Sequence, residues 1–176
     1  MNRLALLLVL SMLAAPVARA VEPNRAVAHV DLQRYAGTWY EQARLPMFFQ
    51  RDCARDTSAT YTLRDDGRID VVNRCTTAQG GMKVATGVAR RVDGSTSRLQ
   101  VRFAPRWLGF LPIVWGDYWI VGLDDDYRWA IVGSPDRDYL WLLSRDRVLD
   151  RGVRDRLVER ARAMGYPVEQ LVFAQP

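Results

Sequence analysis

Several segments between residues 37 and 145 have apolar and polar side chains that alternate one by one, which is the period of a strand with one buried face. Tyr61 and Leu63 each follow a threonine, and the apolar residues of 98–103 alternate with arginine and glutamine. The segments with a strand-like pattern are 37–44, 55–64, 68–76, 82–92, 97–104, 116–123, 128–133 and 139–145. The pattern therefore predicts eight strands.

Short turn sequences separate most of these segments. Asp-Gly occurs in 64–68 and in 92–97, and Gly-Gly occurs in 78–81. Such pairs are typical of tight hairpins between antiparallel strands. Eight strands joined in this way close well into a barrel, and closure leaves no exposed edge. The predicted fold class is therefore all-β, an eight-stranded antiparallel up-and-down β-barrel.

After the last predicted strand, the apolar period changes to that of a helix. The apolar positions are Val148, Val153, Leu157, Ala161 and Met164. Arginines fill the opposite face, and Gly165 and Pro167 end the pattern. We expect one C-terminal α-helix of about 12–15 residues, packed outside the barrel, and then a short strand within 169–175. A helical turn that begins at 30–32 leads into the first strand.

Residues 1–20 have the features of a secretory signal peptide. A basic residue precedes an apolar run from Leu4 to Ala15, and Ala18–Arg19–Ala20 is an A-x-A cleavage pattern. The alternative, a membrane anchor, is weaker because the run is shorter than the roughly 20 residues that a spanning helix needs. We expect cleavage after Ala20, a flexible leader at 21–29 and one domain at 30–176, in an exported protein that is periplasmic or secreted.

The charge of the chain is mild. It has 25 basic and 20 acidic residues and a formal net charge of +5. Loss of residues 1–20 removes two arginines, which leaves 23 basic against 20 acidic side chains, or +3. Acidic residues and arginines are interleaved, as on an ordinary solvated surface, so we expect no nucleic-acid partner.

Two cysteines, Cys53 and Cys75, remain in an exported chain, where a pair usually forms a disulfide. The alternative is a pair of free, buried thiols. No cysteine lies near residue 20, so we expect no lipid anchor there, and any contact with the outer membrane would be made without one. With His29 as the one histidine, the cysteines make no convincing zinc site, and a hairpin turn explains 124–126 more simply than calcium does. We expect no metal or other cofactor.

Three short motifs occur in the order of a known family. They are Gly37–Thr38–Trp39, a G-x-W motif; Asp125–Asp126–Tyr127, similar to T-D-Y with the threonine replaced; and Arg145, which ends the last predicted barrel strand. Together with the order of strands and helix, they resemble the lipocalins over about residues 29–174. The chain looks closely like the bacterial lipocalins of the outer-membrane lipoprotein type and apolipoprotein D.

The resemblance implies structural roles for these motifs at the closed end of the barrel. In lipocalins the motif tryptophan closes the narrow end, and the arginine of the last barrel strand lies across its ring. We therefore expect Arg145 to stack on Trp39 in a cation–π contact worth about 0.5–2 kcal/mol. Gly37 would let the backbone turn closely there, and Tyr127 would belong to the same structural signature.

The resemblance also implies a ligand cavity inside the barrel. If Arg145 points inward, the odd-numbered residues of 139–145 point inward too. Alternation assigns the inward face of two other segments, whereas 116–123 is apolar on both faces and its assignment is only a preference. The residues predicted to line the site are Tyr61, Leu99, Val101, Phe103, Tyr118, Ile120, Tyr139, Trp141 and Leu143. The alternative is a barrel filled by its own side chains, since eight strands lie at the border between the two.

The segment that joins the fifth and sixth predicted strands is unusually apolar for a loop. Strand order places 105–116 at the open end of the barrel. A loop of this composition covers the cavity, docks on a second subunit or another protein, or touches lipid. Arg102 and Arg106 beside it could meet phosphate groups. The loop residues predicted to act at the mouth are Arg106, Trp107, Phe110, Leu111 and Trp115.

No catalytic motif stands out in the chain. It has no Gly-x-Ser-x-Gly elbow and no phosphate-binding loop, and a lipid-modifying enzyme would need one of its cysteines as a free nucleophile. The resemblance instead implies a non-catalytic protein of the cell envelope that binds a fatty acid or lysophospholipid for carriage, storage or membrane maintenance. The runner-up is an interaction protein whose barrel is a scaffold and whose 105–116 loop binds another protein or forms a homodimer.

Overall fold

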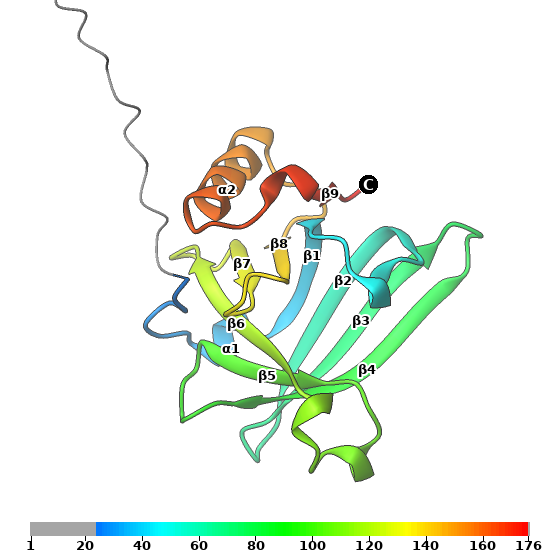
Figure 1. Ribbon diagram of the computed structural model, residues 1–176, viewed down its shortest axis with the longest axis vertical. Helices are drawn as coiled ribbons and strands as arrows, with labels where there is room; N and C mark the ends of the chain where they lie inside the picture. Colours follow the sequence, from blue (N-terminus) through cyan, green and yellow to red (C-terminus); the bar gives the residue numbers. More distant parts are fainter. Residues whose placement is uncertain (1–23, 176) are drawn as a thin grey trace, which may run out of the picture.

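The computed structural model of the chain describes residues 24–175, which form a closed antiparallel β-barrel (Figure 1). The strands are β1 (Gly37–Arg44), β2 (Cys53–Leu63), β3 (Ile69–Thr77), β4 (Met82–Arg91), β5 (Arg98–Arg102), β6 (Gly116–Leu123), β7 (Trp129–Gly133), β8 (Leu140–Ser144) and β9 (Val172–Phe173). The first eight follow one another around the barrel, and β1 closes it by pairing with both β8 and β2. The predicted eight-stranded up-and-down barrel is confirmed, and β9 adds a short strand beside β1.

Two α-helices flank the barrel, and each begins at an aspartate. The side chain of Asp31 accepts hydrogen bonds from N–H groups in the first turn of α1 (Leu32–Tyr35), and Asp150 caps α2 (Arg151–Ala163) in the same way. α2 lies against the outside of the barrel, where its Leu157 is buried (Figure 1). The predicted external helix is therefore confirmed.

Apolar side chains pack in two layers, one inside the barrel and one between its wall and α2. Strand β6 contributes to both: Ile120 belongs to the inner layer and Val121 to the outer layer. The same alternation places Leu143 of β8 inside and Leu142 outside. These strands are apolar on both faces because both faces are covered.

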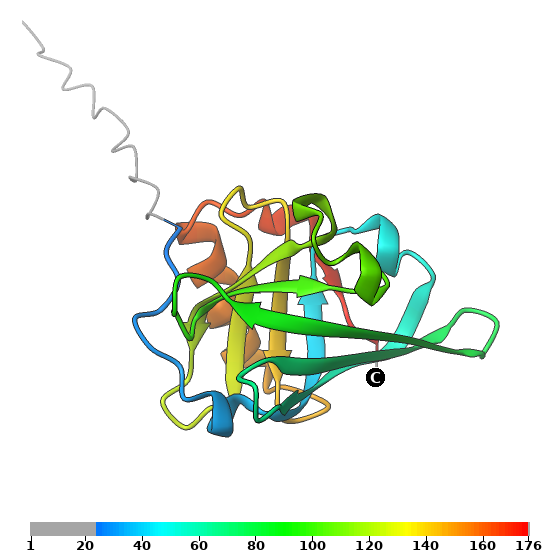
Figure 2. The ribbon, with the colours of Figure 1, turned by 90° about the horizontal axis from the view of Figure 1, so that it is seen from below.

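The two ends of the barrel are built differently. α1 and the β2–β3, β4–β5 and β6–β7 turns lie at the closed end, and the other four connections lie at the open end (Figure 2). Two of those four contain short 3₁₀ turns that the sequence pattern did not predict: η1 (Phe48–Gln50), η2 (Arg106–Leu108) and η3 (Pro112–Val114). β5 pairs with β4 only from Val88 to Arg91, so the β3–β4 hairpin projects past its neighbours at the open end (Figure 2).

Residues 24–29, the described part of the predicted flexible leader, are hydrogen-bonded to the barrel. The backbone N–H of Val27 donates to the carbonyl of Ile120 (2.8 Å), and the Asn24 side chain donates to the carbonyl of Ser134 (2.5 Å). These contacts hold this part of the leader against the barrel, which its polar sequence did not indicate. The predicted signal peptide, residues 1–20, lies outside the described residues.

Candidate ligand-binding site

Trp39 and Arg145 lock the closed end of the barrel. Trp39 is fully buried, and the guanidinium carbon of Arg145 lies 3.9 Å from the centre of its ring, which confirms the predicted cation–π contact. The same guanidinium donates to five backbone carbonyls at 2.7–3.4 Å, those of Arg34, Tyr35, Ala36, Thr38 and Tyr127. Arg145 thus satisfies carbonyls at the end of α1 and ties them to the end of β8.

Gly37 and Tyr127 complete this closure. Gly37 has a φ of +95°, in the region that favours glycine, and a Cβ there would lie 3.3 Å from Nη1 of Arg145. The Tyr127 hydroxyl accepts a hydrogen bond from the backbone N–H of Asp31 (2.8 Å), and Arg34 lies over its ring at 4.1 Å. The motif residues therefore form one structural unit rather than a binding surface.

Three tyrosines meet inside the barrel next to Trp39. The hydroxyl of Tyr118, from β6, lies 2.8 Å from the hydroxyls of Tyr35, from α1, and Tyr61, from β2. Burial raises the pKa of all three hydroxyls, that of Tyr61 to about 12, so they are neutral at pH 7. We call Tyr35, Tyr61 and Tyr118 the tyrosine crossbar. Tyr35, the last residue of α1, was not predicted as an interior residue, although it lies only four residues before Trp39.

Most of the residues predicted to line the site point into the barrel. The buried inner layer contains Tyr61, Leu99, Tyr118, Ile120 and Leu143, and Val101 and Trp141 pack against it. This packing agrees with the inward faces predicted for β2, β5 and β6 and with the inward position of Leu143 in β8. Trp141 packs against the outer layer as well as the inner one. Contact between these residues and a ligand stays a prediction.

The other two predicted lining residues, Phe103 and Tyr139, lie at the entrance. Phe103 follows the end of β5, is 42% exposed and packs on Gly87, where a Cβ would lie 2.8 Å from the ring. Tyr139 precedes β8, and its ring stacks on that of Trp141 (6.1 Å) and contacts that of Phe49 (6.0 Å). Both rings therefore lie at the open end, and Tyr139 packs against the outer apolar layer rather than the inner one.

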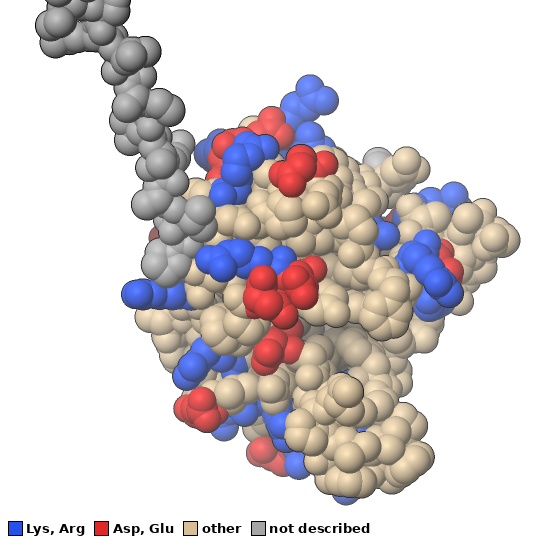
Figure 3. Space-filling view, in the orientation of Figure 1, with Lys and Arg blue, Asp and Glu red and all other residues tan. Residues whose placement is uncertain are grey.

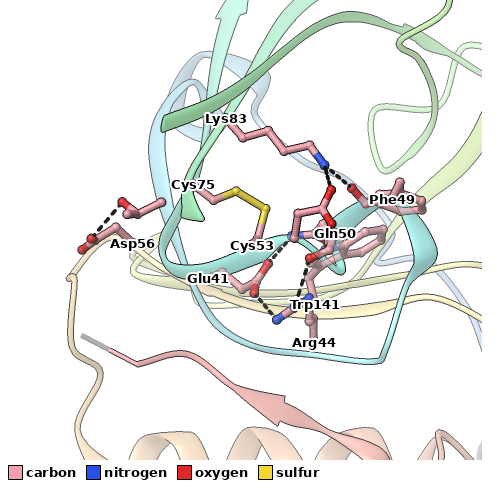
Figure 4. Close-up of a disulfide and its surroundings, with 11 residues drawn as sticks. Glu41, Arg44, Phe49, Gln50, Cys53, Asp56, Cys75, Lys83 and Trp141 are labelled. Atoms are coloured by element: carbon pink, nitrogen blue, oxygen red, sulfur yellow. Dashed lines mark hydrogen bonds and ion pairs between the residues drawn. A yellow bond between two sulfur atoms is a disulfide. The ribbon is translucent and has the colours of Figure 1, made fainter. Parts of the chain in front are cut away.

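A buried polar cluster lies at the mouth end of the interior (Figure 4). Arg44 pairs with Glu41 (3.1 Å), Gln50 donates to the other Glu41 oxygen (2.8 Å), and Nε1 of Trp141 donates to Gln50 (2.9 Å). Burial raises the pKa of Glu41 above its ordinary value of 4.5, although Arg44 and Gln50 both favour the charged form. Nε of Arg44 is buried and has no hydrogen-bond partner among the described residues. The cluster is the main polar feature at this end of the interior.

A β-bulge at Gln42 makes this cluster. The register of β1 against β8 shifts by one residue between Glu41 and Ala43. Glu41 lies two residues after Trp39 and shares its inward face, and the extra residue turns Arg44 to that face as well. Neither residue was among those predicted to line the interior, and the sequence pattern carries no sign of the bulge that turns Arg44 inward.

The connection from β1 to β2 crosses the mouth of the barrel (Figure 4). Gln50 joins it to β1 and β8, and on the other side Nζ of Lys83, from β4, donates to the Phe49 carbonyl (3.3 Å) and to Asp52 (2.9 Å). Polar contacts on opposite walls therefore hold this connection in place.

The predicted disulfide is confirmed. Cys53, at the start of β2, is bonded to Cys75 of β3, with a Cα–Cα distance of 5.5 Å, and the described chain has no free cysteine. A recess of about 490 Å³ beside it, lined in part by Arg51 and Met82, opens to solvent. That recess belongs to the outer rim and not to the barrel interior.

Large apolar side chains are exposed around the open end. They come from the β1–β2 connection, the projecting part of β4 and the β5–β6 connection, where Ile113 is 91% exposed. Figure 3 shows uncharged surface over the β5–β6 connection, at the lower right. We call these residues the apolar rim: Phe48, Phe49, Met82, Val84, Phe103, Trp107, Phe110 and Ile113.

The predicted mouth loop divides into exposed and anchoring residues. Trp107 and Phe110 are exposed, as is Arg106, whereas Leu111 is half-buried. Trp115 is also half-buried; its Nε1 donates to the Gly109 carbonyl (2.8 Å) and folds the loop back on itself.

Arg102 lies beneath the loop. It is buried, and Nη1 donates to the carbonyls of Ala104 (2.8 Å) and Pro105 (2.5 Å). Its guanidinium also lies 5.2 Å from the ring of Trp115. The expectation that Arg102 meets phosphate is therefore wrong, because the loop covers it.

The fold and the site define a class: an eight-stranded barrel closed at one end by a tryptophan under an arginine, open at the other, with one external helix. The family described as the lipocalin-like domain matches residues 30–176, so the chain belongs to the lipocalin family. Temperature-induced lipocalin-1 of Arabidopsis thaliana is 39% identical over 148 residues, or 82% of this chain and 78% of that protein. The outer membrane lipoprotein Blc of Vibrio cholerae is 38% identical over 157 residues, or 88% and 87%.

Solved structures support the fold. Insecticyanin from the tobacco hornworm Manduca sexta has a TM-score of 0.67 and 19% identity, covering 89% of this chain and 86% of its own. A search of residues 24–175 finds no helix of the length and apolar character that a membrane crossing requires.

Proposed function

We propose that this protein binds a single-chain lipid, a fatty acid or a lysophospholipid, in its barrel without covalent chemistry. Lipocalins bind small hydrophobic ligands, and the Vibrio cholerae relative is named an outer membrane lipoprotein. The observation that carries the proposal is an apolar interior that faces an exposed apolar rim at the open end. An acyl chain moved into this interior would gain about 0.8 kcal/mol for each buried CH₂ group.

The polar cluster at the mouth supports an orientation with the head group outermost. Glu41 and Arg44 provide an acceptor and a donor at the entrance, and Arg44 has one N–H that is unpaired within the described chain. Tyr139, at the rim, adds a hydroxyl. The acyl chain would then run inward past Trp141 and Val101 toward the closed end.

The proposed role is lipid carriage, storage or membrane maintenance in the cell envelope after export to the periplasm or secretion. The apolar rim supports a peripheral contact between the open end and an outer-membrane surface, with lipid entering where the rim touches the bilayer. Arg106, exposed beside Trp107, would face lipid phosphates.

Native mass spectrometry of the protein, produced with its own N-terminal segment and incubated with lysophosphatidylethanolamine, tests the proposal. We expect one added lipid mass, and a protein mass that begins at Val21. Trp141→Arg puts a cation in the interior and Val101→Trp fills it, so both should lose the lipid. Tyr40→Phe, on the outward face of β1, is the control and should keep it. A protein that ignores added lipid would disprove lipid binding.

Flotation with vesicles of phosphatidylethanolamine and phosphatidylglycerol tests the membrane contact. Replacing Trp107 and Phe110 by serine should release the protein from vesicles, whereas Val148→Ser, at an exposed apolar position outside the rim, should not. If wild type ignores vesicles and instead forms a dimer that the double serine variant breaks, the rim is a protein interface.

A further inference from the structure

The tyrosine crossbar joins opposite walls of the barrel. β2 and β6 are four strands apart in either direction around the barrel, yet the hydroxyls of Tyr61 and Tyr118 lie 2.8 Å apart. Tyr35 reaches the same point from α1, and its ring packs on Trp39 at a centroid distance of 4.9 Å. Toward α1, the inner layer continues with Trp39 and Val30, which close the barrel. The crossbar therefore lies between the open end and the residues that close the barrel.

The crossbar has one more proton than it has hydrogen bonds. Three hydroxyls carry three protons, and the described residues provide two contacts, one on each side of Tyr118. If both neighbours donate to Tyr118, its own proton is left over. If Tyr118 donates to one neighbour, the proton of that neighbour is left over. In each arrangement one buried O–H has no acceptor in the described protein, and an unpaired buried donor is unfavourable.

The surplus proton favours a neutral oxygen over a carboxylate. Arg145 acts electrostatically on Tyr35, but its guanidinium is occupied by the backbone carbonyls at the closed end. A carboxylate carried to the crossbar would lose its hydration without gaining a counter-charge. A hydroxyl or ketone oxygen is neutral and requires only one hydrogen-bond donor, which the unpaired O–H of the crossbar provides.

We propose that the tyrosine crossbar is the floor of the ligand site and donates a hydrogen bond to an oxygen at the inner end of the lipid. The ligand class is a single-chain lipid with a hydroxyl or ketone far from its head group. This inference rests on the proposed lipid-binding function and sharpens it by naming the chemistry at the inner end. A plain acyl chain would bind but leave the proton unpaired.

The test compares hexadecanoic acid with 16-hydroxyhexadecanoic acid, and the matching pairs with shorter and longer chains. Dissociation constants would be measured for wild type, for Tyr40→Phe as the control, and for a variant with phenylalanine at residues 35, 61 and 118. The triple variant keeps the size of the rings and removes every hydroxyl. We expect the preference for the hydroxylated acid to fall about tenfold in the triple variant at the chain length that reaches the crossbar, and not in the control.

The possible outcomes distinguish failure of this inference from failure of the proposed function on which it rests. Failure of wild type to bind hexadecanoic acid overturns the proposed function and this inference together. Binding of both acids with the same ratio in wild type and triple variant, at every chain length, overturns the inference alone. If the triple variant does not fold, wild type alone still decides. A crossbar that donates a hydrogen bond should let the hydroxylated acid bind as tightly as the plain acid at one chain length. An apolar floor should weaken binding of the hydroxylated acid about tenfold, relative to the plain acid, at all chain lengths.

Discussion

The closed end and the open end of this barrel treat apolar surface in opposite ways. At the closed end Trp39 is fully buried, and Arg145 lies over its ring while donating to five backbone carbonyls. At the open end Trp107 is 73% exposed and belongs to a rim of apolar side chains around the mouth. Tryptophan is thus buried at one end of the barrel and exposed to solvent at the other.

The difference separates apolar surface that stabilises the fold from apolar surface that stays exposed. A buried aromatic ring contributes to folding because its surface leaves water when the chain folds. The exposed rim has made no such gain, so its apolar surface remains available for a ligand or a membrane. We therefore expect substitutions at the closed end to change the free energy of unfolding, and substitutions at the rim to change binding.

The largest expected effect compares the two tryptophans directly. Trp39→Ala should lower the free energy of unfolding by about 3–5 kcal/mol, because it empties the buried centre of the closed end. Trp107→Ala should change it by less than about 0.5 kcal/mol, because the ring is already exposed. Urea unfolding followed by circular dichroism measures both. Equal losses would mean that the loop at the open end is part of the stable core.

The next effect lies at the open end and tests whether this end also contributes to the free energy of unfolding. The disulfide closes a loop with a sequence separation of 22 between Cys53 and Cys75. Replacing both cysteines by serine should lower the free energy of unfolding by about 3 kcal/mol, mainly because the unfolded chain gains freedom. Urea unfolding of this double variant, beside wild type under reducing conditions, gives the value. If the free energy of unfolding fell in neither sample, the disulfide would not restrict the conformations of the unfolded chain.

The closed end could be predicted because its residues match the motifs of a known family. The resemblance of Gly37–Thr38–Trp39 and Arg145 to lipocalin motifs implied the contact of Arg145 with Trp39, which the structure confirms. The inward faces followed from period two. Even β6, apolar on both faces, was assigned correctly, although only the packing of α2 on its outer face explains its composition.

The mouth could not be predicted because its determinants depend on three-dimensional packing. The Gln42 bulge turns Arg44 inward, and no residue type announces a bulge of this kind. Arg102 was expected to face phosphate because it borders an apolar loop, but that loop folds over it. Gln50 became a mouth residue only through a 3₁₀ turn that brings it to Glu41 and Trp141.

A smaller effect tests whether the crossbar belongs to the stable closed end. Tyr118→Phe removes the central hydroxyl and leaves those of Tyr35 and Tyr61 without their partner. It should lower the free energy of unfolding by about 1–3 kcal/mol, because unpaired buried hydroxyls are unfavourable. The variant with phenylalanine at all three positions should be more stable than this single variant, because it leaves no hydroxyl unpaired. Urea unfolding decides: a triple variant less stable than Tyr118→Phe would contradict the proton count.

The smallest expected effect is the pH dependence of the polar cluster at the mouth. Burial raises the pKa of Glu41 above 4.5, so the folded protein holds this proton more tightly than the unfolded chain. Below 4.5 the carboxyl is protonated in both states, and its burial is least unfavourable there. As pH rises from about 4.5 through the folded-state pKa, ionisation should lower the free energy of unfolding of wild type relative to Glu41→Gln. Urea unfolding of both proteins between about pH 4 and pH 7 isolates this difference, because every other titrating group is shared. If wild type instead becomes more stable than Glu41→Gln as pH rises, the ion pair with Arg44 outweighs the burial of the carboxylate. The open end would then gain stability from its charges.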